Sequence, residues 1–187
     1  MIAAVGHGDL TIGTMELVEA ELRSRLARFT GEAGLVRAGA GLPLTFARAV
    51  RTAGRELTVL LPSQGSVPAV LPLRDRAAAG ELIVLARQVR LLPFDPEDRN
   101  SCVGADEQVV RVCRTVLAVW DGSPSDGSDA TAHLVAYARA HGIPVDIVWP
   151  EGAARTGGPG RGRPGQPARP APRPGTGGRP TLAGGRR

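Results

Sequence analysis

Hydrophobic residues along the chain fall into short apolar runs separated by longer segments of helical period. The runs predict strands at residues 2–6, 34–38, 57–61 and 89–92, and two more inside the segment 116–149. Spacings of three and four residues predict helices over 11–29, 42–53, 75–88 and 103–113, with a fifth inside 116–149. Loops are expected at 62–74 and 93–101, where proline, glycine, serine and charged residues gather.

Strands that alternate with helices are typical of one fold class. We therefore expect an α/β protein with a doubly wound, mostly parallel Rossmann-like sheet of about six strands and helices on both faces. Near Glu151 the composition changes abruptly to glycine, proline, arginine, alanine and threonine, which bury too little apolar surface to offset chain entropy. The sequence thus predicts a folded domain over 1–151 and a disordered tail over 152–187. A chain ending at Gly152 should melt at the same temperature as the full chain.

Charge is spread unevenly between these two parts. All 23 basic residues are arginine, and the formal net charge is +5. Eight arginines lie in 152–187, which has no acidic residue, so residues 1–151 carry a formal charge of −3. A basic folded surface is therefore not expected. Only the tail, with Arg161 and Arg163, could make a weak contact with nucleic acid.

Cysteine usage and hydropathy limit the classes of protein to which the chain could belong. Cys102 and Cys113 lie eleven residues apart without clustered histidines, so we expect neither a metal site nor a cofactor. No apolar run approaches the length of a membrane span, and the N-terminal residues look like a first strand rather than a signal peptide. We expect a cytoplasmic protein without membrane contact and leave homo-oligomer formation open.

The segment 116–149 has the pattern of a complete βαβ unit, with a Gly/Ser/Asp loop between its first strand and its helix. Ligands of parallel sheets bind outside the carboxyl ends of the strands, which places Asp121 and Gly122 at a candidate site. Ser128, Asp129 and Thr131 enter the following helix, where hydroxyls and backbone N–H groups can bind a phosphate or sugar. An Asx turn and a helix N-cap would explain the same residues equally well.

Two earlier loops carry glycine at the ends of strands. Gly39-Ala40-Gly41 permits a tight turn and close approach of a phosphate to backbone N–H groups. Gly6 and His7 end the first strand, and His7 could contact a phosphate or base, although a loop histidine without a role is as compatible with the sequence. Neither a full GxGxxG motif nor a P-loop is present, which disfavours dinucleotide use and ATPase activity.

These blocks together resemble the SLOG superfamily, the Rossmann-like fold of DprA/Smf proteins, LOG nucleoside-monophosphate phosphoribohydrolases and TRPM-type ligand sensors. The resemblance spans about residues 2–150. It rests on Val-Gly-His-Gly at 5–8, Arg-Ala-Gly-Ala-Gly at 37–41, Val-Leu-Leu-Pro at 59–62, Ala-Val-Trp-Asp-Gly at 118–122 and Tyr-Ala-Arg-Ala-His-Gly-Ile-Pro-Val at 137–145.

The resemblance implies a nucleotide phosphate held between two Gly-rich loops, here Gly39–Gly41 and Gly127–Thr131. The second loop keeps one glycine and the threonine. In LOG-type hydrolases acidic residues that serve catalysis follow this threonine, whereas Ala132 and His133 follow it here. The resemblance therefore implies binding or sensing of a nucleotide or an ADP-ribose-like small molecule, and catalysis that is absent or feeble.

Two alternative functions remain. A nucleoside-monophosphate N-glycosidase, or phosphoribohydrolase, would need a carboxylate to stabilise an oxocarbenium-like transition state. Asp121 or Asp129 would have to take that catalytic role, and Asp121, at a strand end, is the first candidate. A nucleic-acid-associated protein would use the arginine-rich tail, and the net acidity of residues 1–151 argues against it.

Overall fold

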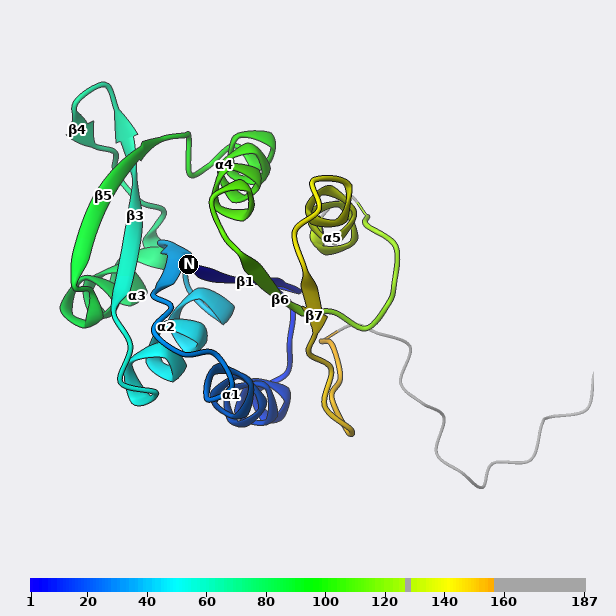
Figure 1. Cartoon of the computed structure of the whole chain (residues 1–187). Helices are drawn as coiled ribbons and strands as arrows, with labels where there is room; N and C mark the ends of the chain where they lie inside the picture. Colours follow the sequence, from blue (N-terminus) through cyan, green and yellow to red (C-terminus); the bar gives the residue numbers. More distant parts are fainter. Residues whose placement is uncertain (127–128, 157–187) are drawn as a thin grey trace, which may run out of the picture.

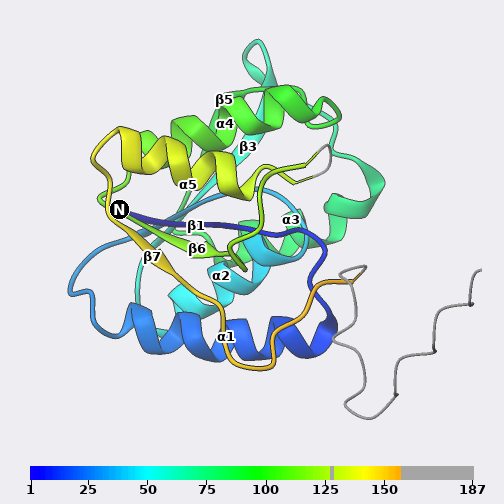
Figure 2. The same ribbon diagram turned by 90° about the vertical axis from the view of Figure 1, so that its right-hand side faces the viewer.

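The computed structural model describes residues 1–126 and 129–156, and these form one sheet with a layer of helices on each face (Figures 1 and 2). The expected fold class is confirmed. The strands are β1 (Ile2–Gly6), β2 (Gly34–Arg37), β3 (Leu57–Gln64), β4 (Val67–Pro68), β5 (Gln88–Pro93), β6 (Thr115–Val119) and β7 (Val145–Ile147).

The strand order places the reversal of the chain between β1 and β6. Parallel pairing runs β5–β3–β2–β1–β6–β7, and β4 is a two-residue antiparallel partner at the end of β3. The chain winds outward from β1 to β5 and then crosses back to β6. In such sheets ligands bind where the strand order reverses, outside the carboxyl ends of the strands.

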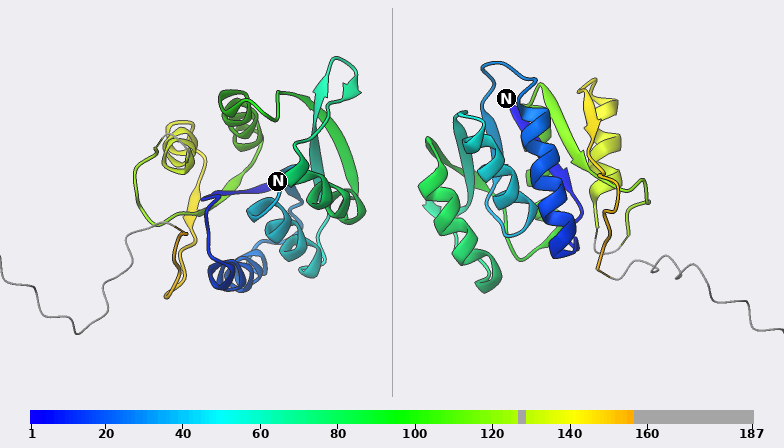
Figure 3. Two further views of the ribbon diagram at one scale, coloured as in Figure 1. Left: turned by 180° about the vertical axis from the view of Figure 1, so that it is seen from behind. Right: turned by 90° about the horizontal axis from the view of Figure 1, so that it is seen from below.

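The helices divide into two layers according to the direction in which the chain winds. Helices α1 (Ile12–Leu26), α2 (Leu42–Thr52) and α3 (Leu73–Leu85) lie side by side on one face (Figure 3). Helices α4 (Arg99–Arg111) and α5 (Thr131–Ala140) cover the other face. Right-handed crossovers require this change of face when the direction of winding reverses.

Burial explains why the central strands are so apolar. The β1, β2, β3 and β6 strands lie between the two layers, and their residues are mostly buried. The main core under α1 and α2 is built around the fully buried side chains of Ile2, Leu22, Phe46 and Leu57. A second core joins α5 to β6 through Val116, Leu134 and other residues. Both are continuous with the strand ends that form the candidate site.

Two elements differ from the sequence-based expectation. Strand β4 lies in the predicted loop 62–74. Its two residues are too few to show the alternation of apolar and polar side chains that predicts a strand. Helix α4 begins at Arg99, inside the predicted loop 93–101, because the Asp98 carboxylate accepts a hydrogen bond from the Ser101 N–H at 2.7 Å. A side-chain cap of this kind satisfies a backbone donor of the first turn, so the helix can begin here rather than later in the chain.

The packed chain continues beyond the expected end of the domain at residue 151. The Thr11 N–H donates to the carbonyl of Ala154, and the Ala154 N–H donates to Oγ1 of Thr14 at 2.7 Å. The backbone of Arg155 forms an isolated antiparallel β-bridge with that of Leu10. Contacts therefore reach Thr156, five residues into the tail predicted over 152–187. The rest of that tail, residues 157–187 with their possible nucleic-acid contact, lies outside the described residues. Among residues 1–126 and 129–156, no helix is long and apolar enough to cross a membrane.

Candidate functional site

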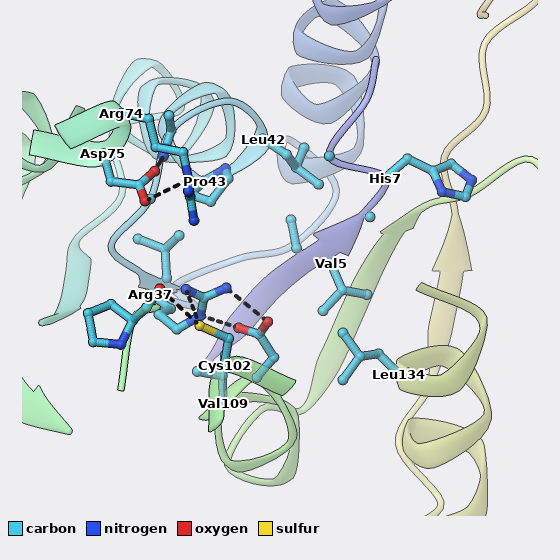
Figure 4. Close-up of a pocket in the computed structure, with 18 residues that line it drawn as sticks. Val5, His7, Arg37, Leu42, Pro43, Arg74, Asp75, Cys102, Val109 and Leu134 are labelled. Atoms are coloured by element: carbon cyan, nitrogen blue, oxygen red, sulfur yellow. Dashed lines mark hydrogen bonds and ion pairs between the residues drawn. The ribbon is translucent and has the colours of Figure 1, made fainter. Parts of the chain in front are cut away.

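A cleft of about 460 Å³ opens at the carboxyl ends of β1 and β2 (Figure 4). One wall is the loop after β1, and the opposite wall is the first turn of α2 together with the start of α3. Helix α4 supplies the third side. Among its lining residues are Gly6, Gly8, Gly39, Ala40, Arg37, Arg74, Asp75, Cys102 and Asp106. The volume lies within the range of small-molecule sites, roughly 300–1,000 Å³.

A smaller hollow of about 210 Å³ adjoins the cleft and reaches the start of α5. The two share the walls made by Gly8, Arg37 and Asp106. The smaller hollow is also lined by Asp129 and Thr131. The loop after β1 thus lies between the start of α2 and the start of α5.

Charged groups in the cleft are already paired within the protein. The Arg37 guanidinium donates to both carboxylate oxygens of Asp106, at 2.7 and 3.1 Å. Burial alone would lower the pKa of Arg37, but the charge and hydrogen bonds of Asp106 outweigh it and raise that pKa, so Arg37 stays cationic. Because its Nε and one Nη bind Asp106, further N–H groups of this guanidinium remain to bind a ligand.

The backbone just before α2 already binds a carboxylate of the protein, that of Asp75 in the first turn of α3. The Ala40 N–H donates to Oδ1 of Asp75 at 2.9 Å, across the mouth of the cleft. Gly41, the N-cap of α2, has φ of +72°, a conformation that L side chains rarely adopt. Arg74, next to Asp75, is largely exposed. An anionic ligand group at this turn would compete with Asp75 for the Ala40 N–H and would find the Arg74 cation beside it.

A second cluster surrounds His7, on the far side of the loop from the cleft. The imidazole is fully buried, with Nε2 2.9 Å from Oδ1 of Asp121 and Nδ1 in contact with Oδ2 of Asp129. The indole of Trp149 meets its ring edge-on. In Figure 4 the His7 ring points away from the other lining residues. Only the loop around this histidine, not its ring, therefore faces the cleft.

The two aspartates also make local backbone contacts. Oδ1 of Asp121 accepts from the Ser123 N–H at 2.9 Å, and Oδ1 of Asp129 accepts from the N–H and hydroxyl of Thr131 at 2.8 and 2.6 Å. These are the Asx-turn and helix-start contacts that the sequence allows as an alternative to ligand binding. The geometry holds the loop before α5 against β1 and β6.

Arg155 completes this cluster from the C-terminal end of the described chain. Its Nε lies 2.8 Å from Oδ1 of Asp9, one Nη lies 3.3 Å from Oδ2 of Asp129, and the other lies 3.9 Å from Oδ2 of Asp121. A single guanidinium thus lies within 4 Å of three carboxylates at the reversal of strand order.

These contacts shift the acidity of both aspartates in the same direction. Burial alone would raise the pKa of Asp129, but hydrogen bonds from Thr131 and His7 outweigh it and lower that pKa below its ordinary value. For Asp121 burial is likewise outweighed by hydrogen bonds from Ser123 and His7, and its pKa is lowered. Both side chains are carboxylates at neutral pH and act as acceptors.

The predicted site residues separate into three groups. The first lines the two hollows and consists of Gly6, His7, Gly39, Ala40, Asp129 and Thr131. The second, Gly41, Asp121 and Gly122, lines neither hollow. Ser128 falls outside the described residues.

The glycine at position 6 is required by packing. An added Cβ there would lie 2.7 Å from the Cβ and the carbonyl oxygen of Val119, whereas one at Gly8 would meet nothing within 4 Å. Open space at the loop therefore lies at Gly8, which the sequence does not single out.

The sequence pattern does not single out the charged residues of the cleft. Arg37 ends β2, so its position at a strand end was an available signal. Asp106 lies within helix α4, and Asp75 within the first turn of α3, where nothing in the local pattern distinguishes them from solvated residues. In the described part of the chain, no group of three or more His, Cys, Asp or Glu residues is arranged to hold a metal ion.

Comparisons with known proteins yield only distant likenesses. No protein-family model matches the chain. No curated protein matches it. Similar solved structures include two of the molybdenum cofactor carrier protein from Chlamydomonas reinhardtii. One is 17% identical, covers 78% of this chain and 74% of that chain, and has a TM-score of 0.49. The other is 16% identical, covers 79% and 74%, and has a TM-score of 0.49.

An uncharacterised protein from Agrobacterium tumefaciens C58 is 15% identical, covering 79% of this chain and 62% of that chain, with a TM-score of 0.21. Likenesses of this size do not identify a ligand or an activity for this chain.

Proposed function

We propose that the cleft beside β1 and β2 binds a nucleotide or a nucleotide-derived ligand, in the manner that the resemblance to the SLOG superfamily implies. One observation carries the proposal. A hollow of about 460 Å³ lies between the loop after β1 and the loop after β2, with glycine and alanine backbone on both walls. Such backbone allows a phosphate or sugar to approach main-chain N–H groups closely.

The charges in the cleft suit a ligand with both anionic and hydroxyl groups. Arg74 offers guanidinium N–H donors at the mouth, and Arg37 offers further donors inside. Guanidinium groups bind phosphate oxygens through paired donors. The Asp75 and Asp106 carboxylates are acceptors that suit ribose hydroxyls. Because the cleft contains as many carboxylates as guanidinium groups, we expect modest affinity for inorganic phosphate alone.

Binding without efficient hydrolysis is part of the proposal. Asp121, the first candidate for a catalytic carboxylate, lines neither hollow, and both it and Asp129 contact His7. A carboxylate that stabilises an oxocarbenium-like transition state must face the sugar. The remaining carboxylate deep in the cleft, Asp106, is held by Arg37 in a bidentate pair. Its charge is thereby directed toward the protein.

Calorimetric titration of the full chain with AMP, ADP-ribose and NAD tests the binding proposal. Gly8→Val and Gly39→Val place a branched side chain in the cleft at positions without backbone strain, so both should weaken binding at least tenfold. Gly13→Val, on an open surface of α1, is the matched control and should bind as the wild type does. Gly41 is unsuitable because its positive φ would confound binding with folding.

Normal binding by both cleft variants would place the ligand elsewhere, and no binding by the wild type to any of the three ligands would reject the nucleotide class. Release of free base from AMP, CMP, GMP and UMP, followed by chromatography, tests the rival hydrolase. We expect no turnover above the uncatalysed rate. Turnover abolished by Asp106→Asn would instead establish a glycosidase, because a positioned acid or base contributes roughly 10²–10⁴-fold.

A further inference from the structure

Helix α3 is apolar on two opposite sides. Its inner side packs on the sheet through Ala78, Ala79 and Leu82, which are buried. Its outer side carries Leu73, Ala77, Gly80 and Val84 at spacings of four, three and four residues, which fall on one line along a helix. All four are exposed, Leu73 by 80% and Val84 by 85%. We call these four residues the α3 face.

This arrangement is unusual for a helix at the surface of a domain. Surface helices carry polar residues on the side away from the core, and a helix that is apolar all round is normally covered on both sides. Helix α3 lies at the outer end of its layer, and α2 is its neighbour on one side only (Figure 3). Within the described chain, no element packs on the α3 face.

Other exposed apolar side chains occur in the segments before and after α3 in the chain. Val67 and Val70, in the segment that leads into α3, are largely exposed. Val89 and Leu91 of β5 are partly exposed at the edge of the sheet, where β5 pairs with β3 alone among the described strands. Single exposed apolar side chains are ordinary, whereas the four residues of the α3 face follow one line along a helix and mark an interaction surface.

We propose that the α3 face joins two copies of this chain, with α3 of each copy packed antiparallel on α3 of the other. The order of side chains along the helix is self-complementary for a two-fold axis. An axis through the middle of the face places Leu73 against the partner's Val84 and brings Ala77 beside the partner's Gly80. Small residues at the crossing allow two helix axes to approach to about 8 Å, the lower end of the usual range.

Charge favours the antiparallel arrangement over the parallel one. Arg74 and Glu81 lie on the same flank of the α3 face, one near each end of the helix, and both are at least half exposed. The two-fold axis brings Arg74 close to the partner's Glu81, where it would join the ion pair that Glu81 makes with Arg48 of α2, and the same contact forms twice. A parallel two-fold would instead set Arg74 beside the partner's Arg76, a like charge on the opposite flank of the helix. The opposite charges also disfavour an anionic membrane surface as the occupant, because Glu81 would be repelled.

The expected dimer is of moderate strength. A helix of 13 residues is about 20 Å long, so the α3 face alone covers less than the roughly 800 Å² per partner of a standard interface. We therefore expect a dimer that dissociates on dilution.

Sedimentation velocity of the full chain over a wide range of concentrations tests the proposal. The wild type should shift from monomer to dimer as concentration rises. Val84→Glu and Ala77→Glu should raise the dissociation constant at least tenfold, because each buries a charge in the contact. Ile12→Glu, at a position 82% exposed on α1, is the matched control and should dimerise as the wild type does. Unchanged melting temperatures show that the variants fold.

Exchange of the two charges distinguishes the antiparallel α3 pairing from any other contact between two copies of the chain. Arg74→Glu and Glu81→Arg should each weaken the dimer, and the double variant should restore it, because the opposite charges meet again across the axis. A monomer at all concentrations would overturn the proposal, as would a dimer insensitive to Val84→Glu. Binding of monomers to anionic or neutral lipid vesicles that Val84→Glu abolishes would also overturn it, in favour of a membrane surface.

Discussion

One Nη atom of Arg155 lies 3.3 Å from Oδ2 of Asp129, and this contact ties the end of the described chain to the loop before α5. The same carboxylate oxygen contacts His7, whose ring is fully buried beside β1. Arg155 therefore closes a chain of contacts that joins the loops after β1 and β6, where the strand order reverses. The reversal of the sheet, a common location for ligands, is here occupied by the protein's own side chains.

The contact predicts where the folded unit ends. A chain ending at Thr156 should melt at the temperature of the full chain, whereas one ending at Gly152 should melt lower. Loss of the Arg155 contacts leaves Asp129 without a cation, which costs about 2 kcal/mol. For a chain of this size that corresponds to a fall of roughly 4–8 °C.

Differential scanning calorimetry of the two truncated chains and of Arg155→Ala in the full chain makes this comparison. Equal melting temperatures for all of them would restore the boundary after residue 151. A lower temperature for the chain ending at Thr156 would show that residues after 156 contribute to stability.

Stability should fall in acid through Asp121 and Asp129. The pKa of each is lowered in the folded protein, so each contributes stability that is fully present above the ordinary pKa of about 3.9. That contribution is lost as the pH falls through the lowered pKa, because protonation removes the charge that accepts the hydrogen bonds. Asp129→Asn should therefore be less stable than the wild type near neutral pH, with the difference shrinking in acid.

Urea unfolding at a series of pH values, for the wild type, Asp129→Asn and Glu16→Gln, measures this effect. Glu16 lies on an exposed side of α1 and serves as the control. A difference between wild type and Asp129→Asn that stays constant down to low pH would contradict the assignment.

His7 and Asp129 should be energetically coupled. Removal of either partner deletes their buried contact, while Thr131 and Arg155 still bind Asp129 and Asp121 still binds His7, so His7→Phe and Asp129→Asn should each cost about 1–3 kcal/mol. The double variant should cost less than the two single costs together by about 1–3 kcal/mol, since the partners contact each other. Equilibrium unfolding of the four proteins gives the coupling energy. Strict additivity would mean that the contact contributes nothing to stability.

The glycines at positions 6 and 8 should behave in opposite ways. Gly6→Ala introduces a Cβ 2.7 Å from the Val119 backbone and should destabilise the fold by at least about 2 kcal/mol. Gly8→Ala meets open space and should leave the melting temperature within about 2 °C of the wild type. Thermal unfolding compares them directly. An equally small effect at both positions would show that β1 can shift away from β6.

The candidate site was only partly predictable from the sequence. The glycine loops after β1 and β2 could be placed, because the carboxyl ends of parallel strands meet at one edge of the sheet. The roles of the individual residues within those loops could not be predicted. Gly6 is a glycine because Val119 packs on it, and His7 contacts the buried Asp129 and the more exposed Asp121, although the sequence allowed a role in ligand binding for both.

The sequence by itself determined the order and type of the elements except the two-residue strand β4, since apolar runs and helical periods are local patterns that directly report burial on one or both sides. It did not determine which polar residues meet. Asp106 reaches Arg37 from 69 residues away, and Arg155 reaches Asp9 from 146 residues away. Only the tertiary structure decided these pairs, because the crossing from β5 back to β6 and the return of residues 152–156 set the distances. A charged side chain looks the same in a sequence whether it is solvated or paired.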